Sequence, residues 1–272
     1  MGLLNYLTYD GVDSRDFGVF ISGEGAFDAP ARRGEMISIP GQNGSLFMDE
    51  GVFENITVEY PAFIGTGYEA IFRNKLGDLR SALTSRGNYK RLTDTYHPDE
   101  FRLGVYREGL EVDPKVITRA GGFTMKFDCK PQRFLVSGET PHIFTANGTI
   151  SNPTLFESSP IIKVTGNGTI AIGPYIFRVS NNLWTIIIDT EIMEAYLPAG
   201  EIYSLTDENG DIITEEIGIE IEVVDGSPVA TNMLGYIEFL DSIMPKIPPG
   251  EQPIKMSPTI TKLEIIPRWW RL

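Results

Sequence analysis

Short runs in which apolar and polar residues alternate fill most of the chain, and glycines and prolines separate them. The early runs include "DFGVFIS" and "FENITVEY", and "YKRLTDTY", "FRLGVYRE" and "GGFTMKFDCK" follow after residue 88. A period of two turns one face of each strand toward a core, and Gly and Pro mark the turns between strands. The pattern predicts a mainly β protein with antiparallel strands.

One segment has a helical period instead. Within residues 67–87 the apolar positions recur at steps of three or four, at Tyr68, Phe72, Leu76, Leu79 and Leu83. This spacing puts the side chains on one face of a helix, and the glycine that ends the segment is a frequent helix stop. The sequence therefore predicts a single long helix among the strands.

A change in the sequence pattern after residue 130 indicates a domain boundary. Pro131, Gly138 and Pro141 lie close together in "KPQRFLVSGETPH", where proline removes a ladder donor and glycine permits an irregular turn. Beyond them, "PIIKVTGNGTIAIG", "YIFRVSN" and "TKLEIIPRWW" have the spacing of a sandwich or jelly roll. We expect a first domain at 1–137 and a second at 138–272.

Residues 37–50, "ISIPGQNGSLFMDE", place two turn dipeptides between apolar runs. Pro40-Gly41 and Asn43-Gly44 supply the backbone angles that turns require, including the positive φ of a tight turn. The segment has no lysine and does not open a helix, so it is not a phosphate cradle. It predicts a hairpin tip with an apolar flank at Ile37, Ile39, Leu46 and Phe47.

Charge and hydropathy narrow the classes of partner. The 272 residues carry 37 Asp+Glu against 23 Lys+Arg, a net charge of −14, and most of the excess carboxylate lies in the second half. Phosphate binding needs clustered cations, so we expect no sequence-specific nucleic-acid partner. The longest apolar run, "WTIII" at 184–188, is too short to span a bilayer, and we expect no membrane insertion.

Candidate catalytic and metal-binding residues are sparse. His97, His142 and Cys129 show no ligand spacing, and "DENGD" at 207–211 departs from a calcium loop because Ile212 stands where glycine is required. The sequence contains no nucleophile elbow, and two histidines leave little for a catalytic triad. We expect no catalytic residue, no cofactor and no metal.

Four segments, taken in order, resemble the distal tail protein (Dit) family of bacteriophages with long, non-contractile tails. They are "SIPGQNGSLFMDEGVFENITVEY", "FDCKPQRFLVSGE", "NPTLFESSPIIKVTGNGTIAI", and "MPKIPPGEQPIKM" leading to "TKLEIIPRWW". "TIIIDTEIMEAY" is similar to a further strand of that family. Each is a strand-and-turn pattern, and together they span nearly the whole chain. The stretch 202–239 departs from the family because it is longer and more acidic.

The resemblance implies a fold and a role. The fold is an N-terminal β-sandwich with one α-helix and an extended β-hairpin arm, followed by a galectin-like or jelly-roll β-sandwich. The role is a structural virion protein, not an enzyme, that is made in the host bacterial cytoplasm and lies at the distal end of the phage tail. There a homo-hexameric ring connects the tail tube to the host-adsorption apparatus and leaves a central channel for DNA.

The resemblance also implies partners and an interface. The partners are the tail tube protein, the tape measure protein, the tail-associated lysin or tail-tip hub protein, and a receptor-binding protein. The hairpin lies on the neighbouring subunit as a belt arm, where edge pairing and ring closure satisfy it. The implied interface residues are Ile39, Pro40, Gly41, Gln42, Asn43, Gly44, Ser45 and Leu46.

Two other classes of function stay open. A carbohydrate-binding module is suggested by the sandwich pattern and by Trp184, Trp269 and Trp270, because aromatic rings can stack on sugars. Trp269 and Trp270 are adjacent on a strand and point to opposite faces, so one of them is a candidate surface aromatic. A glycoside hydrolase is the other class, since the spacing of a carboxylate pair is set by the fold.

Overall fold

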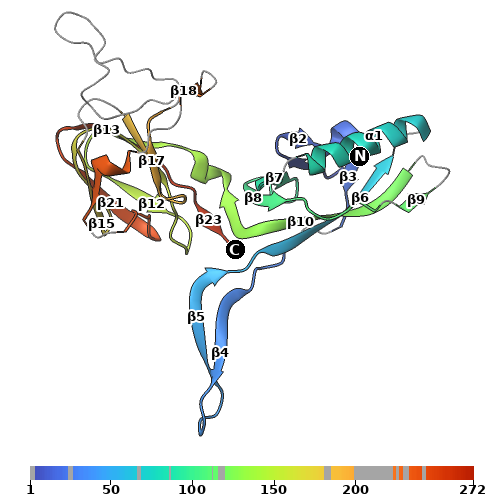
Figure 1. The fold of residues 1–272 in the computed structure, drawn as a ribbon, viewed down its shortest axis with the longest axis horizontal. Coiled ribbons are helices and arrows are strands. Elements are labelled where there is room, and N and C mark those ends of the chain that lie inside the picture. Colours follow the sequence, from blue (N-terminus) through green and yellow to red (C-terminus); the bar gives the residue numbers. More distant parts are fainter. Residues whose placement is uncertain are drawn as a thin grey trace, which may run out of the picture. The chain divides into compact units, whose positions relative to one another are not determined.

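A computed structural model describes residues 4–23, 27–65, 69–85, 87–111, 113–115, 120–180, 185–198, 223–224, 227–228, 233–240 and 243–272. These residues are mainly β-strand with one α-helix, which confirms the predicted class. Their contacts divide the chain into two compact units (Figure 1). The first unit is Met1–Val136 with Arg271–Leu272, and the second is Ser137–Trp270.

The first unit is built around one nine-stranded sheet in the order β2-β1-β7-β8-β10-β6-β3, with β9 and β23 also paired to β10. Its longest strand, β10, buries Phe123, Met125, Phe127 and Cys129 on one face because successive side chains alternate. The strands are β1 (Leu7–Tyr9), β2 (Val12–Asp13), β3 (Val19–Ile21), β6 (Ile56–Gly65), β7 (Lys90–Asp94), β8 (Glu100–Val105), β9 (Asp113–Lys115), β10 (Ala120–Leu135) and β23 (Trp270–Arg271).

The predicted helix is present as α1 (Glu69–Thr84). Phe72, Leu79 and Leu83 of its apolar stripe are buried in the core of the first unit, and Leu76 packs against that core. Tyr68, the first position of the predicted stripe, lies outside the described residues. The helix therefore covers the face of the sheet that carries the buried strand residues. A short 3-10 helix, η1 (Ser14–Phe17), precedes β3.

Pro131, one of the three residues that indicate the boundary, lies inside β10, which runs through it to Leu135. Between Cys129 and Arg133 the register against β8 shifts, which marks a β-bulge. A proline fits such a place because the ladder is already interrupted there and no N–H donor is missed. Proline in the sequence marks the bulge here and not the end of the strand.

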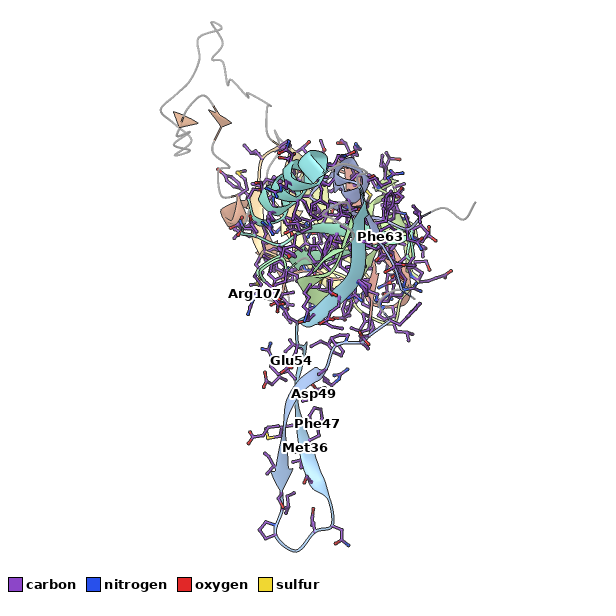
Figure 2. The ribbon with its side chains drawn as sticks, turned by 90° about the vertical axis from the view of Figure 1, so that its right-hand side faces the viewer. Met36, Phe47, Asp49, Glu54, Phe63 and Arg107 are labelled. Carbon is purple, nitrogen blue, oxygen red and sulfur yellow. The ribbon has the colours of Figure 1, made fainter. Side chains whose placement is uncertain are left out.

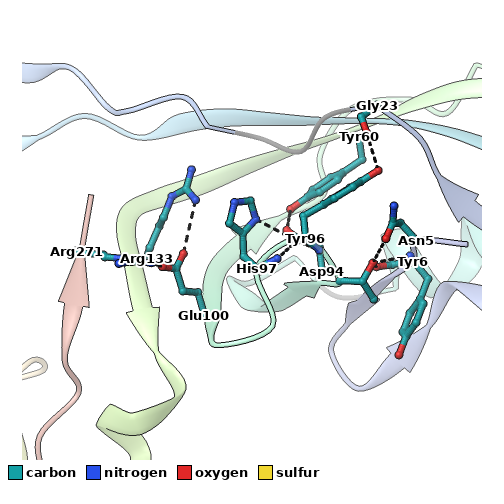
Figure 3. Close-up of polar contacts among 11 residues, drawn as sticks. Asn5, Tyr6, Gly23, Tyr60, Asp94, Tyr96, His97, Glu100, Arg133 and Arg271 are labelled. Carbon is teal, nitrogen blue, oxygen red and sulfur yellow. Dashed lines mark hydrogen bonds and ion pairs between the residues drawn. The ribbon is translucent and has the colours of Figure 1, made fainter. Parts of the chain in front are cut away.

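The chain's last two residues belong to the first unit, although the sequence assigns them to the second domain. Arg271 forms an ion pair with Glu100, whose side chain is 5% exposed. Arg133 lies 3.6 Å from the same carboxylate (Figure 3). A buried carboxylate requires such partners, so the two arginines stabilise the charge of Glu100.

Asp94 is the second polar centre of the first unit (Figure 3). Its carboxylate accepts hydrogen bonds from the Tyr60 hydroxyl at 2.7 Å and from the backbone N–H groups of Tyr96 and His97 at 2.9 Å each. Burial, followed by the charge of Asp94, raises the pKa of Tyr60 well above its usual value. Tyr60 therefore stays a neutral donor to Asp94.

The second unit contains two five-stranded antiparallel sheets whose inward side chains form its core. One sheet has the order β11-β22-β13-β16-β17, and the other β12-β21-β14-β15-β20. The strands are β11 (His142–Phe144), β12 (Gly148–Asn152), β13 (Ile161–Gly166), β14 (Gly168–Ile172), β15 (Tyr175–Val179), β16 (Thr185–Asp189), β17 (Glu194–Tyr196), β20 (Ile237–Phe239), β21 (Gly250–Met256) and β22 (Ile260–Ile266). The shorter elements are β18 (Val223–Val224), β19 (Ser227–Pro228), η2 (Val136–Glu139) and η3 (Leu234–Tyr236).

Gly138 lies where two segments of the second unit approach closely. Its carbonyl accepts a 2.8 Å hydrogen bond from the Arg268 N–H. A Cβ at Gly138 would lie 2.3 Å from the Trp269 backbone nitrogen. The structure thus requires glycine here for close packing and not, as the sequence suggests, for the freedom of an irregular turn.

We predict that Gly138→Ala lowers the free energy of unfolding of the second unit by about 3 kcal/mol, because the new methyl group overlaps backbone atoms that cannot move aside. Calorimetric unfolding of the full chain measures the change. Gly235→Ala is the matched control, since a Cβ there meets nothing within 4 Å. Equal transitions for the two variants would contradict the close-packing explanation.

Asp189 and Arg268 form a bidentate ion pair in the second unit. Both Arg268 terminal nitrogens lie 2.7 Å from an Asp189 carboxylate oxygen. Arg268 has a positive φ of 55°, an uncommon conformation for a non-glycine residue. Burial raises the pKa of Asp189, but the hydrogen bonds and the charge of Arg268, together with backbone hydrogen bonds from Glu191 and Ile192, outweigh it, and the pKa lies below its usual value.

Asp189→Asn should lower the free energy of unfolding by about 2 kcal/mol at pH 7, the range of a hydrogen bond to a charged group. The folded-state pKa lies below the unfolded value of about 4, so this contribution is complete above pH 4 and is lost as the pH falls. Denaturant titrations of both proteins at several pH values measure it. A difference that persists undiminished at the lowest pH at which both proteins fold would refute the ionic origin.

Candidate functional site

The predicted hairpin is a two-stranded ribbon, β4 (Arg32–Ser38) and β5 (Ser45–Phe53), which we call the arm (Figure 1). Its strands pair with each other and with no other described strand. The register places Met36 opposite Phe47 and Ile37 opposite Leu46. Figure 2 shows Met36 and Phe47 on the arm with no other drawn element beside them.

The tip of the arm, from Ile39 to Gly44, contains one defined turn. The Gln42 N–H donates to the Ile39 carbonyl at 3.2 Å, and Gly41 has a φ of +83°. With proline before a glycine of positive φ, this is a type II turn. Gly44 has a φ of +87°, but Asn43 is not among the residues with positive φ. The dipeptide therefore supplies one positive φ and not two, and the tip is longer than a two-residue turn.

One side of the arm, the ladder face, carries Arg32, Gly34, Met36, Phe47, Asp49 and Phe53, of which Met36 and Phe47 are exposed. The Arg32 guanidinium pairs with Asp49 and lies 4.7 Å from the centre of the Phe53 ring. The Gly51 N–H, together with Arg32, holds the pKa of Asp49 below its usual value. The ring of Phe47 lies against Gly34, where an added Cβ would be 2.6 Å from Cζ. These contacts stiffen a ribbon that has no core.

The other side, which we call the apolar face, carries Ile37, Leu46 and Met48, and Glu35 lies on the same side opposite Met48. Leu46 is 52% exposed and Met48 is 54% exposed, whereas Ile37 is half-buried. Ile39 adds a further exposed apolar side chain at the tip. The alternation of a strand places these residues on the side opposite Met36 and Phe47.

The arm lacks the burial that normally stabilises a hairpin. An isolated two-stranded ribbon is marginally stable in water, because neither face is covered by a second layer. Each Å² of apolar surface removed from water contributes about 25 cal/mol, so an exposed row of apolar side chains favours association. Contiguous exposed apolar surface of this kind marks an interaction site.

The tryptophans do not form an open aromatic platform in the described part of the chain. Trp269 is 3% exposed. Trp270 is half-buried; its ring stacks on Phe156 at 4.3 Å, and its Nε1–H donates to the Glu157 carbonyl at 2.9 Å. Trp184 lies outside the described residues. One face of the candidate surface aromatic is thus already occupied by Phe156.

The residues weighed for metal or catalytic chemistry are dispersed. Nδ1 of His97 lies 3.1 Å from the Asp94 carboxylate, and burial raises the pKa of the Cys129 thiol to about 12. Over the described ranges, no group of three His, Cys, Asp or Glu side chains could hold a metal ion. The segment 207–211 lies outside these ranges. Of the helices described, none is long and apolar enough to cross a membrane.

Several arm residues with a role in its geometry are not found from the sequence pattern alone. Met36 and Met48 extend the exposed apolar surface, and Gly34 makes room for Phe47. The ion pair of Arg32 with Asp49 joins residues seventeen positions apart. The sequence alone does not pair these two positions, because the register of the two strands depends on the length of the loop at the tip.

No protein-family model and no curated protein matches the chain by sequence. Solved structures do match it, and the fold they define is that of phage tail hub and baseplate proteins. In particular, the Dit protein of phage SPP1, described as a paradigm of the hub adsorption apparatus in phages infecting Gram-positive bacteria, superposes with a TM-score of 0.67 at 15% identity. The match covers 99% of this chain and 100% of that chain.

A chain of the phage P2 baseplate, in its activated conformation with calcium, superposes with a TM-score of 0.53 at 8% identity. The match covers 97% of each chain. At such identities the likeness concerns the fold. The predicted fold, mainly β with one α-helix, an extended hairpin arm and a β-sandwich, is thereby confirmed.

Gly34→Ala should loosen the arm, because a methyl group at this position displaces the Phe47 ring or the Met48 carbonyl, which lies 2.5 Å from the new carbon. We expect tryptic cleavage after Arg32 and Arg33 to become about tenfold faster, which corresponds to 1.4 kcal/mol of easier local opening. Ser38→Ala on the same strand is the control and should leave the rate unchanged. Equal cleavage rates for both variants would show that the ladder face does not stiffen the arm.

Proposed function

We propose that the chain is a distal tail protein, a structural component of a phage tail tip. In this proposal six copies form a ring that connects the tail tube to the host-recognition apparatus and leaves a central channel for DNA. The first unit forms the ring, and the second is an accessory sandwich. The chain acts as a structural part and not as an enzyme.

The observation that carries the proposal is the arm. A stiffened ribbon with an uncovered apolar face, on a fold shared along its whole length with a phage hub protein, is suited to bind a neighbouring subunit. The interface on this side consists of the residues expected from the sequence, Ile39 to Leu46, extended by Ile37 and Met48. A different surface receives the arm, so the contact is heterologous.

The size of the arm favours a ring over an isolated pair. Seven residues of strand span about 23 Å, and two strands are about 10 Å wide, so one face of the arm offers about 230 Å². A stable pairwise interface buries about 800 Å² on each partner. In a closed ring every copy both gives and receives an arm, and closure adds these contacts without forming fibres.

The remaining partners and the location follow from the same proposal. The ring would contact the tail tube protein and the tape measure protein on one side, and the tail-associated lysin or hub protein and a receptor-binding protein on the other. The protein would be made in the host bacterial cytoplasm and incorporated into the virion at the distal end of the tail. The net charge of −14 disfavours DNA binding and suits a channel that DNA only passes through.

The alternatives have less support. A carbohydrate-binding module needs an aromatic platform with convergent polar groups, whereas Trp269 is buried and Trp270 is stacked on Phe156. A glycoside hydrolase needs two carboxyl groups facing one pocket. Neither requirement explains an exposed hairpin.

We expect the concentrated protein to form rings of six copies in negative-stain micrographs. Replacing residues 40–45 with a two-residue turn should abolish the rings, since it removes the tip and Ser45 from the interface. The variant should retain the folded first unit, because the arm pairs with no other strand in the described part of the chain. Intact rings from this variant, or a stable symmetric dimer of the unaltered chain, would contradict the proposal.

A further inference from the structure

The sheet of the first unit has one face that no described helix covers. On β6 the residues Val58, Tyr60, Ala62 and Ile64 are buried beneath α1, and the alternate residues face outward. The outward residues include Pro61 and Phe63. Phe63, labelled in Figure 2, is 39% exposed.

Phe63 belongs to an apolar row that continues across strands. Phe20 on β3 is its direct partner, and the two ring centres lie 5.8 Å apart. Gly122 stands opposite Phe63 on β10 and has no side chain to cover the ring on that side. We call Phe20, Pro61 and Phe63 the aromatic row. It ends at an ion pair, where Lys126 lies 2.9 Å from Glu59.

We propose that the aromatic row of one copy is the seat for the apolar face of another copy's arm. The inference rests on the proposed function and specifies the surface that receives the arm. Ile37, Leu46 and Met48 would cover Phe20, Pro61 and Phe63, and the thioether of Met48 is suited to contact an aromatic ring. In this arrangement the ladder face, which carries Met36 and Phe47 beside the ion pair of Arg32 with Asp49, is left outward.

The small area of the arm face and the apolar chemistry of the seat favour a second copy of this chain as the occupant. The row is short and apolar, and the neighbouring Lys126 and Glu59 already neutralise each other, so the seat offers little to a charged partner. An arm face of about 230 Å² is too small for a separate partner held by this contact alone, for which about 800 Å² is typical. The same area is sufficient for a ring, because every copy in the ring repeats the contact.

The seat also differs from the other exposed apolar positions described in the first unit outside the arm. Leu4, Val12, Tyr89 and Val136 are exposed singly, which is ordinary for a protein surface. Phe27 is 72% exposed, and its ring contacts His97. Phe63 alone among these residues extends an apolar row along the uncovered sheet face.

Disulfide trapping in the full chain tests the seat. Cys129 is the single native cysteine, and it is buried with a raised pKa, so it does not react under mild oxidation. In the variant Leu46→Cys with Phe63→Cys, a seated arm places one new cysteine beside the other on the next copy. Oxidation should produce a ladder of covalent oligomers that reaches six copies and collapses on reduction.

Two control variants measure how much disulfide forms by random collision between copies. Leu46→Cys alone can form no more than dimers, because each copy then carries one accessible thiol. Leu46→Cys with Thr149→Cys places the second cysteine on the exposed side of β12 in the second unit and should not form a ladder. A ladder of equal yield from this pair would overturn the seat.

Micrographs of the same samples after reduction distinguish failure of the seat from failure of the proposed ring. Rings without a ladder from the Leu46 and Phe63 pair would overturn the seat and leave the proposed ring standing. If the concentrated unaltered chain forms no rings and the variant with cysteines at positions 46 and 63 forms no ladder, both the seat and the proposed ring are overturned. Rings together with the specific ladder support both.

Substitution gives a second readout. Phe63→Ser should reduce the fraction of copies found in rings at least tenfold, whereas Ile143→Ser, which removes a 59% exposed side chain from the second unit, should not. Circular dichroism checks that both variants fold. Folded Phe63→Ser protein that assembles as the unaltered chain does would contradict the seat.

Discussion

A two-stranded ribbon has no interior, and this constraint governs the arm. The side chains of β4 and β5 have only each other to contact. The polar and aromatic side chains of the ladder face therefore pair with one another and stiffen the ribbon. The apolar face then has no cover from the described residues of its own chain. Burial is the dominant favourable contribution to association, so a ribbon held straight and left uncovered favours association with another molecule.

The two compact units do not share this constraint. The first buries a continuous core between its sheet and α1, and the second buries the inward faces of two sheets. Each also pairs a buried carboxylate with arginine, with Glu100 held by Arg133 and Arg271, and Asp189 by Arg268. Uncovered apolar side chains occur in both units, and the arm and the aromatic row carry several of them.

Elements with strong local signals were predictable from the sequence. The stripe of Phe72, Leu79 and Leu83 predicts α1, and Pro40-Gly41 predicts the turn at the tip. Features that depend on long-range contacts were not predictable. Pro131 resembles a boundary until β8 shows the bulge that accepts it, and Gly138 resembles a flexible turn until Trp269 is found against it. The exposure of Met36 and Met48 likewise follows from the absence of a covering layer, which no local pattern records.

Hydrogen exchange of the arm amides tests the central claim most directly. If another copy covers the arm, amides in residues 32–53 should exchange slowly in the assembled protein and at least tenfold faster in dilute monomer, while the core of β10 should exchange equally slowly in both. Equal and rapid exchange of the arm in the two states would show that assembly leaves it uncovered, and it would contradict the account.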